Sequence, residues 1–278
     1  MDKKTKGRQG DDSSSKGALY IIGIGPGGLE HLTFKAKQVL ENCDAVVGYK
    51  TYIDLIKGVI QGKEIFSTGM TKEVNRCQKA IDLALQGKKV AVVSSGDEGI
   101  YGMAGLVLEL LPESGARSQK SEEKNKSEIE KRKSKIFVSV IPGVPAFCAA
   151  ASLLGAPLMH DFASISLSDL LTPWETIRKR LDMASAADFV IILYNPKSKT
   201  RVSQLEEAIG IISTHRNENT PVGTVKNATR EGEEIKITTL KGLPVHYDFI
   251  DMSTILIIGN STTFVSHNKM ITPRGYDV

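Results

Sequence analysis

The residues best suited to chemistry stand close together in the segment 96–102, which reads GDEGIYG. Three glycines in seven residues allow a ligand to approach the backbone, or they simply make a tight connection. Asp97 adds a carboxylate and Tyr101 a phenol. An aspartate in such a loop can accept a hydrogen bond from a ribose hydroxyl or an ammonium group, or it can stabilise the turn itself. The sequence leaves both roles of Asp97 open.

The segment 96–102 lies between two elements that would hold it in place. The apolar run 90–93 is short and bounded by turn residues, which is typical of a strand buried on both faces. Apolar residues then recur at helical spacing across 103–111. Because open α/β sheets bind ligands at the carboxyl ends of their strands, this strand–turn–helix pattern predicts a ligand site at the loop.

Strands and helices alternate through both halves of the chain. Further strand-like runs occur at 18–24, 45–47, 136–141, 163–167, 189–194, 221–225, 234–240 and 254–258. Helical patterns fill most of the intervals, and we expect Thr33 to cap one helix and Thr172 to open a capping box before Pro173. The alternation predicts two α/β domains, 18–142 and 143–278, with a cleft between them.

Charge is concentrated in two polar segments. Residues 1–17 carry a net +2 and residues 112–135 a net +3, so of the chain's +4 the remainder carries −1. We expect a disordered tail at 1–17 and a solvated charged insertion at 112–135. The near-neutral remainder lacks the clustered basic face of nucleic-acid-binding proteins, so we expect no nucleic-acid partner.

Several other classes of protein are disfavoured. No apolar run reaches the roughly 18 residues of a membrane helix, and residues 1–17 lack the apolar centre of a signal peptide, which predicts a cytoplasmic protein without a membrane partner. The three cysteines, Cys43, Cys77 and Cys148, form no disulfide or metal pattern and are predicted to be buried thiols. The five histidines show no ligand spacing, so we expect no metal site.

The run GIGPGG at 23–28 matches the glycine pattern of a dinucleotide-binding loop. Pro26 removes a backbone N–H that would contact a pyrophosphate. The strand at 45–47 also lacks an acidic residue at its end, where that fingerprint places one. Both departures disfavour a dinucleotide site.

Other strand-end loops complete the candidate site. They lie at 25–26, 142–146, 194–195, 226–229 and 259–260, and we expect them to gather at the ligand-binding edge. Their small residues and backbone groups suit a neutral or zwitterionic ligand with an adenine, a ribose and an amino-acid end. Lys197, Lys199 and Arg201 share a loop with Asn195, and Arg230 ends a similar loop; such cations favour an anionic partner.

Taken together, these segments resemble the tetrapyrrole (corrin/porphyrin) methyltransferase family. The resemblance covers nearly all of residues 18–260 and is carried by GIGPG at 23–27, GDEGIYG at 96–102 and PGVPA at 142–146. Within the family, GMTKE at 69–73, SSGD at 94–97, GIYGMA at 99–104 and LYNPKSKTR at 193–201 are similar to the branch that methylates C17 of precorrin-3B or cobalt-precorrin-3. Glu98 departs from the family, which usually has proline there, and the segment 112–135 is longer than its usual connection.

The resemblance implies a homodimeric enzyme that uses S-adenosylmethionine and methylates C17 of its tetrapyrrole substrate while the ring contracts, in cobalamin biosynthesis. It implies cofactor contacts from Pro26, Gly96, Asp97, Ile100, Pro145, Ala146, Asn195, Ala228 and Gly259. The substrate carboxylates would meet Lys197, Lys199, Arg201 and Arg230. Asp97 and Tyr101 are the candidates for the proton transfers of ring contraction.

Two alternatives remain open at this level. One is another member of the same family: a methyltransferase acting at a different precorrin position, a diphthine synthase or a ribosomal-RNA 2′-O-methyltransferase. The protein- or RNA-directed relatives would not need the cationic loop 195–201. The other alternative is a nucleotide-binding regulator without catalytic activity.

Overall fold

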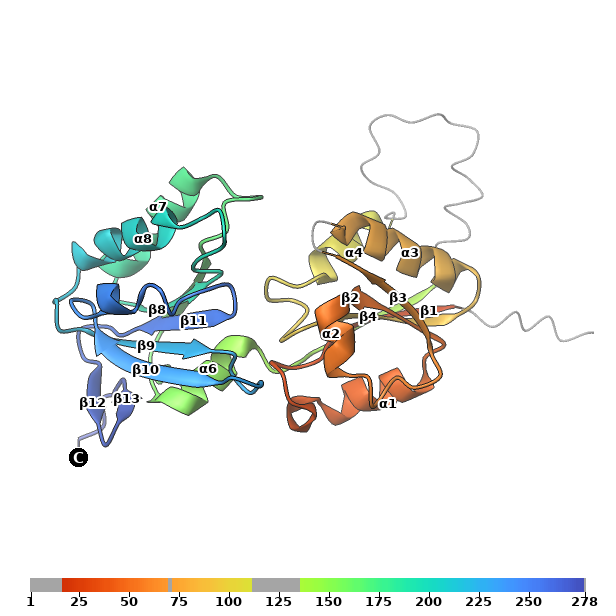
Figure 1. The fold of residues 1–278 in the computed structure, drawn as a ribbon, viewed down its shortest axis with the longest axis horizontal. Coiled ribbons are helices and arrows are strands. Elements are labelled where there is room, and N and C mark those ends of the chain that lie inside the picture. Colours follow the sequence, from red (N-terminus) through yellow and green to blue (C-terminus); the bar gives the residue numbers. More distant parts are fainter. Residues whose placement is uncertain (1–16, 70–71, 112–135, 278) are drawn as a thin grey trace, which may run out of the picture. The chain divides into compact units, whose positions relative to one another are not determined.

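The structure is a computed structural model that describes residues 17–69, 72–111 and 136–277. These residues form two compact units (Figure 1). The first holds the described residues up to Ile24 and from Thr33 to Gly143, and the second holds Gly25–Leu32 and the described residues from Val144 onward. The domains expected from the sequence, 18–142 and 143–278, therefore differ from these units in the segment Gly25–Leu32 and at Gly143. Most of the expected tail and all of the expected insertion lie outside the described residues.

The first unit is built on a five-stranded sheet in which every pair of neighbouring strands is parallel. Its strands, in the order β3-β2-β4-β1-β5, are β3 (Glu64–Thr68), β2 (Ala45–Tyr49), β4 (Lys89–Ser94), β1 (Ala18–Gly23) and β5 (Phe137–Ile141). All five strands consequently end at the same edge of the sheet. The central strands are buried on both faces, as their unbroken apolar runs predicted.

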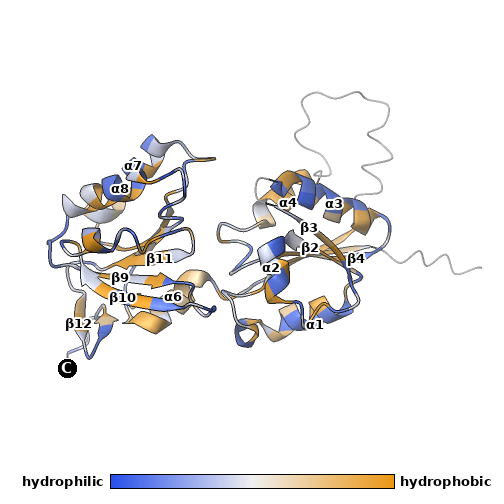
Figure 2. Ribbon diagram, in the orientation of Figure 1, coloured by the Kyte–Doolittle hydropathy of each residue, from blue (hydrophilic) through white to orange (hydrophobic). Residues whose placement is uncertain are grey.

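Helices cover both faces of this sheet (Figure 1). They are α1 (Phe34–Asn42), α2 (Lys50–Leu55), α3 (Glu73–Leu85) and α4 (Ala104–Leu110). The helices α3 and α4 bury Ile81 and Val107 in one core with Ile21 and Val92 of the sheet. Figure 2 shows the apolar strands enclosed between helices whose outer faces are hydrophilic. Burying each large aliphatic side chain of this core contributes about 1.5–3 kcal/mol.

The second unit has a mixed five-stranded sheet in the order β10-β9-β11-β8-β7. Its strands are β7 (Phe162–Ser166), β8 (Val190–Tyr194), β9 (Pro221–Lys226), β10 (Glu234–Thr239) and β11 (Thr254–Ile258). Strands β7 and β8 are parallel, but β11 lies between β8 and β9 and runs antiparallel to both. A separate small sheet joins β6 (Gly155–Ala156), β13 (Lys269–Ile271) and β12 (Phe264–Ser266).

Helices also lie on both faces of the mixed sheet (Figure 1). The unit contains η1 (Leu29–His31), α6 (Ala146–Leu154), α7 (Trp174–Ala186), α8 (Ser203–Ser213) and η2 (Leu243–His246). Leu181 of α7 and Ile209 of α8 share a core with Ile191 and Leu193 of β8. On the other face, Leu154 of α6 packs against Gly223 of β9, where a larger residue would collide with it.

Two of the local predictions have opposite outcomes. The Thr33 hydroxyl accepts a hydrogen bond from the Ala36 N–H at 3.1 Å, so the predicted cap of α1 is confirmed. The capping box predicted at Thr172 is wrong, because α7 begins only at Trp174 and Pro173 occupies the cap position without a side-chain bond.

The cysteines also divide. Cys43 and Cys77 are buried, as predicted, whereas Cys148 is exposed on α6, between the buried residues Phe147 and Ala149. Among the described residues, no helix is long and apolar enough to cross a membrane.

Candidate active site

The loop after β4 places Asp97 at the carboxyl edge of the first unit's sheet. Its Oδ1 accepts a hydrogen bond from the Gly99 N–H at 2.8 Å, which is the turn-stabilising bond that the sequence allowed. Its Oδ2 accepts another from the Gly143 N–H, just after β5, at 3.0 Å. Asp97 therefore ties together loops that are 46 residues apart in the chain.

Three glycines bring the ends of β1, β4 and β5 into direct backbone contact. A Cβ atom on Gly23 would lie 2.6 Å from the Gly96 carbonyl oxygen and 2.7 Å from the Gly143 nitrogen. A Cβ on Gly143 would overlap the same Gly96 oxygen and lie 2.7 Å from the Gly23 carbonyl carbon. Gly96 also has a φ of +72°, a left-handed conformation that glycine adopts without strain. Only residues without side chains at positions 23 and 143 allow these strand ends to meet.

Tyr101 is presented to solvent by an uncommon backbone conformation. Its φ is +55°, which is rare for an aromatic residue, and the residue is 53% exposed. Left-handed backbone at a bulky residue persists only where surrounding contacts impose it, and such residues cluster at functional sites. The phenol thus stands on the same loop as Asp97 and Ile100, at the edge where the sequence predicted a ligand.

Glu98 is the residue of this loop whose role the sequence analysis missed. It is 1% exposed, and its Oε2 accepts a hydrogen bond from the Met103 N–H at 2.8 Å. Burial is the main cause that raises the pKa of the Glu98 carboxyl to about 8, with the neighbouring Asp97 charge adding to the rise. The available signal in the sequence was a glutamate at a position where the resemblance led us to expect proline.

In the second unit, the start of α6 lies beside the end of β8. The Phe147 N–H, directly after Pro145 and Ala146, donates a hydrogen bond to the Tyr194 hydroxyl at 3.2 Å. Asn195 follows Tyr194 with a φ of +49°, and its Nδ2 donates to the Ser166 hydroxyl at the end of β7. The residue after Ala146 therefore contacts the Tyr194 side chain, one residue before Asn195.

Pro26 and Ala228 lie in neighbouring segments of the second unit. The Arg230 Nε–H donates a hydrogen bond to the Pro26 carbonyl oxygen. A Cβ atom on Gly27 would lie 2.6 Å from the Thr229 carbonyl oxygen, so the segment after Pro26 packs closely on the turn that contains Ala228. Thr229 has a φ of +60°, an outlier for a β-branched residue. Arg230, one of the predicted substrate-binding cations, thus contacts this segment through its Nε–H.

Gly259, which the sequence placed among the cofactor contacts, lies apart from the other candidates of the second unit. Gly259 follows β11, which runs antiparallel to β8 and β9, so it lies at the opposite edge from Asn195 and Ala228. Its N–H donates to the carbonyl of Pro221, the first residue of β9. A cavity of about 420 Å³ at this other edge is lined by Asp188, Asn260 and Arg274 among others.

The four predicted substrate-binding cations have different environments. Arg201 is 7% exposed, and its guanidinium contacts the Pro196 carbonyl at 3.3 Å and the Asp169 carboxylate at 3.8 Å. The Lys197 ammonium donates to the Tyr247 carbonyl at 3.1 Å. Lys199 is exposed. Of these three cations, Lys199 is thus the exposed one, whereas Arg201 is held by contacts within the fold.

These environments predict a difference in stability. Arg201→Met is expected to lower the free energy of unfolding by about 2 kcal/mol or more, because it leaves the buried Pro196 carbonyl without its donor. Lys199→Met is the matched control, and its effect is expected to stay within about 0.5 kcal/mol. Urea denaturation at pH 7 measures both values. Equal values for the two variants would contradict the structural role of Arg201.

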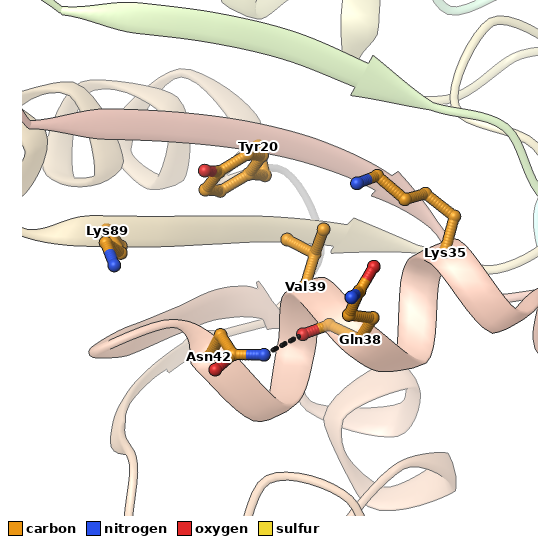
Figure 3. A pocket seen from close by; sticks show the side chains of 6 residues that line it. All are labelled: Tyr20, Lys35, Gln38, Val39, Asn42 and Lys89. Atoms are coloured by element: carbon orange, nitrogen blue, oxygen red, sulfur yellow. Dashed lines mark hydrogen bonds between the residues drawn. The ribbon is translucent and has the colours of Figure 1, made fainter.

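A smaller hollow lies away from the Asp97 loop, toward the amino ends of β1 and β4 (Figure 3). Tyr20 forms its wall, Lys35 and Lys89 stand on either side, and α1 contributes Gln38, Val39 and Asn42. Its volume of about 200 Å³ is below the range typical of ligand sites. In the part of the chain that the structure describes, no three His, Cys, Asp or Glu side chains gather to hold a metal ion.

The chain belongs to the tetrapyrrole (corrin/porphyrin) methylase family, whose model matches residues 18–119 and 121–244. The loop 96–102, which contains Asp97, lies within the first of these matched segments. Among its relatives is a probable cobalt-factor III C(17)-methyltransferase of Salmonella typhimurium, 48% identical over 258 residues, which cover 93% of this chain and 99% of that protein.

Other relatives are longer. A cobalt-factor III methyltransferase of Priestia megaterium is 49% identical over 261 residues, which cover 94% of this chain but 45% of that protein. The chain thus spans about half the length of this relative. Among solved structures, the methyltransferase CobJ superposes with a TM-score of 0.81 at 30% identity, covering 92% of this chain and 100% of CobJ. The cobalt precorrin-4 methyltransferase CbiF gives a TM-score of 0.67 at 25% identity, covering 91% of this chain and 98% of CbiF.

Proposed function

We propose that this protein transfers a methyl group from S-adenosylmethionine to C17 of precorrin-3B or cobalt-precorrin-3, with contraction of the ring, in cobalamin biosynthesis. Membership of the tetrapyrrole methylase family supports the reaction class. The near full-length match to a relative named as a cobalt-factor III C(17)-methyltransferase supports the position that is methylated. The observation that carries the proposal is the meeting of three strand-end loops at Asp97 in a chain of this family.

The residues around Asp97 fit a ligand with ribose and amino-acid groups. The carboxylate accepts one backbone N–H at each oxygen, and each oxygen keeps a further lone pair for a hydroxyl or an ammonium donor. The glycines at 23, 96 and 143 leave the adjoining backbone free of side chains. Gly96, Asp97 and Ile100 are the proposed contacts in the first unit. Pro26, Pro145, Ala146, Asn195 and Ala228 remain the predicted contacts in the second.

The chemistry asks for positioning more than for a reactive side chain. Bound S-adenosylmethionine supplies a methyl group already activated by its sulfonium, and the electron-rich macrocycle supplies the attacking carbon. Holding two reactants in line can lower the barrier by about 7–11 kcal/mol. Ring contraction also needs proton transfers, for which we propose Tyr101, with Asp97 as the second candidate. Tyr101 is favoured because the residue is 53% exposed at the carboxyl edge of the sheet.

The substrate carries several carboxylates, and we propose Lys199 as a cation that meets one of them. Lys197 is a second candidate, although its ammonium already donates to a backbone carbonyl. The loop 195–201, which contains both lysines, begins with Asn195 directly after β8. Arg201 and Arg230 are left out of this proposal because each is committed to contacts within the fold.

Incubation of the protein with methyl-labelled S-adenosylmethionine and a tetrapyrrole tests the function directly. One arm uses precorrin-3B and the other its cobalt-containing counterpart, and mass spectrometry and NMR locate the label. The proposal expects a single labelled methyl group at C17 of a ring-contracted product in at least one arm. Label at another ring position, or transfer only to RNA or protein, would assign the chain to a different branch of the family.

Asp97→Ala is expected to weaken binding of S-adenosylhomocysteine at least about tenfold, because it removes an acceptor worth roughly 1.5–3 kcal/mol to a charged or hydroxyl donor. Isothermal titration calorimetry measures the affinity, and Asp82→Ala, on the exposed face of α3, is the control. Unchanged affinity in Asp97→Ala would contradict the proposed cofactor site.

The proposal also includes a homodimer that works in the cytoplasm without a membrane or nucleic-acid partner. Size-exclusion chromatography with light scattering tests the dimer, and cell fractionation tests the location.

A further inference from the structure

Glu98 accepts two hydrogen bonds from the end of the turn that follows it. Its side-chain Oε2 accepts a hydrogen bond from the Met103 N–H at 2.8 Å, and its main-chain oxygen accepts another from the Ala104 N–H at 3.2 Å. These two donors begin α4. The residues between Glu98 and Met103, which include Ile100 and Tyr101, are therefore held in a closed turn by a single residue.

Gly102 presses this turn against Glu98. A Cβ atom on Gly102 would lie 2.6 Å from the Glu98 carbonyl oxygen and 2.7 Å from its Cα atom. Glu98 as a whole is 1% exposed. Because the turn is packed directly on this residue, the carboxyl group cannot leave its place without moving the residues that cover it.

The surroundings of the Glu98 carboxyl favour its neutral form. Within the described part of the chain, Oε1 is buried and has no hydrogen-bond partner. The titratable groups near it are the Asp97 carboxylate on the same loop and the Cys77 thiol on α3. Hydrogen bonds with the Met103 backbone and with the Ser94 side chain and backbone favour the charged form of Glu98. Burial outweighs them and raises the pKa of Glu98 to about 8. Burial also raises the pKa of Cys77, to about 11, so the thiol stays neutral.

Ionisation of Glu98 would reach Asp97 through the turn. The Gly99 N–H, one residue after Glu98, donates to Asp97 Oδ1, while the Gly143 N–H holds Oδ2. A buried carboxylate without a counter-ion is costly and is relieved when the group moves to water. That movement would displace Gly99, and with it one of the two donors that fix the Asp97 carboxylate.

We propose that Glu98 is a positioning residue for the cofactor, whose neutral carboxyl locks the turn 98–104 and thereby holds Asp97 in its binding geometry, and whose ionisation releases that turn. The proposal rests on the proposed binding of S-adenosylmethionine at Asp97. It assigns to this chain a pH-sensitive affinity that a proline at position 98 could not provide.

The test is the affinity for S-adenosylhomocysteine between pH 6.5 and 9.5, measured by isothermal titration calorimetry. For the unmodified protein, Kd is expected to stay level up to about pH 8 and then to rise by up to about tenfold per pH unit. Glu98→Gln keeps an acceptor for the Met103 N–H and cannot ionise, so it should lack this rise. Glu109→Gln, the same change at an exposed position of α4, is the control and should follow the unmodified protein. Titration of the ligand's own amine is common to all three and cancels in the comparison.

A second variant separates positioning from simple filling of space. Glu98→Met fills the same volume without accepting from Met103, so its affinity should be lower than that of Glu98→Gln at every pH and should lack the rise. Parallel pH profiles for the unmodified protein and Glu98→Gln would overturn the inference and leave the cofactor site intact. Equal affinities of the Gln and Met variants would overturn the positioning role. Failure of every form to bind S-adenosylhomocysteine at any pH would remove the proposed function together with the inference.

Discussion

Gly143→Ala is expected to abolish detectable cofactor binding and to lower the free energy of unfolding by about 3 kcal/mol or more. The added Cβ would overlap the Gly96 carbonyl oxygen and press on the Gly23 backbone at 2.7 Å. Both neighbours are backbone atoms at strand ends, which cannot move aside as a flexible side chain would. The strand ends must therefore separate, and the Gly143 N–H would move away from Asp97 Oδ2.

Gly105→Ala provides the matched control for this change. Gly105 is exposed in α4, and apart from its chain neighbours and the backbone of its own helix no atom lies within 4 Å of the position that its Cβ would take. Replacing a helical glycine by alanine typically stabilises a protein by about 0.5–1 kcal/mol. Urea denaturation and calorimetric titration of S-adenosylhomocysteine measure both variants. A Gly143→Ala protein with unchanged stability and affinity would show that the three loops do not meet as described.

Glu98→Gln is expected to stabilise the protein increasingly as the pH rises from 5.5 to 8. The pKa of Glu98 is about 8 in the folded chain and near its ordinary value of 4.5 once unfolded. Between these values the folded state keeps a proton that the unfolded state has released, so the unmodified protein loses stability as the pH rises. The loss is about 1.4 kcal/mol per pH unit, or roughly 3 kcal/mol over this interval.

Denaturation curves recorded at several pH values check this difference. The gain of Glu98→Gln over the unmodified protein should grow up to about pH 8 and stay level above it. Glu109→Gln reports the effect of losing an exposed glutamate from the same region. Parallel stability curves for Glu98→Gln and the unmodified protein would mean that the buried carboxyl is already ionised at pH 5.5.

Much of the first unit could be predicted from local patterns. Its central strands are buried on both faces, and such strands appear in the sequence as short unbroken apolar runs. The loop after β4 was found because three glycines and a carboxylate follow one of these runs. Strand β3 was missed, because it lies at the edge of the sheet and its residues 64–68 are largely exposed and carry no such run.

Strand direction in the second unit was beyond the local pattern. The run 254–258 is apolar and completely buried, and nothing within it distinguishes a parallel from an antiparallel strand. Parallel neighbouring strands need a crossover connection of a dozen or more residues, which is usually an α-helix. The connection before this run contains only the short helix η2. That missing helix was the available signal that Gly259 would lie at the other edge.

The burial of individual charged residues could not be predicted from the sequence either. Arg201 and Lys199 are two residues apart in the same cationic loop, yet one is buried and the other exposed. The contacts that bury Arg201 come from Asp169 and Met252, which are distant in the chain. Only the folded arrangement determines which of two neighbouring cations faces solvent.

The assignment of Gly25–Leu32 to the second unit has a consequence for any attempt to dissect the protein. The chain passes between its units three times, after Ile24, after Leu32 and after Gly143. Cutting the single peptide bond after Gly143 would not yield two complete folding modules. The N-terminal fragment would still contain Gly25–Leu32, which belongs to the second unit. The C-terminal fragment would lack this segment, whose Pro26 carbonyl accepts a hydrogen bond from Arg230. Two complete units would require the segment Gly25–Leu32 to be fused to the C-terminal fragment.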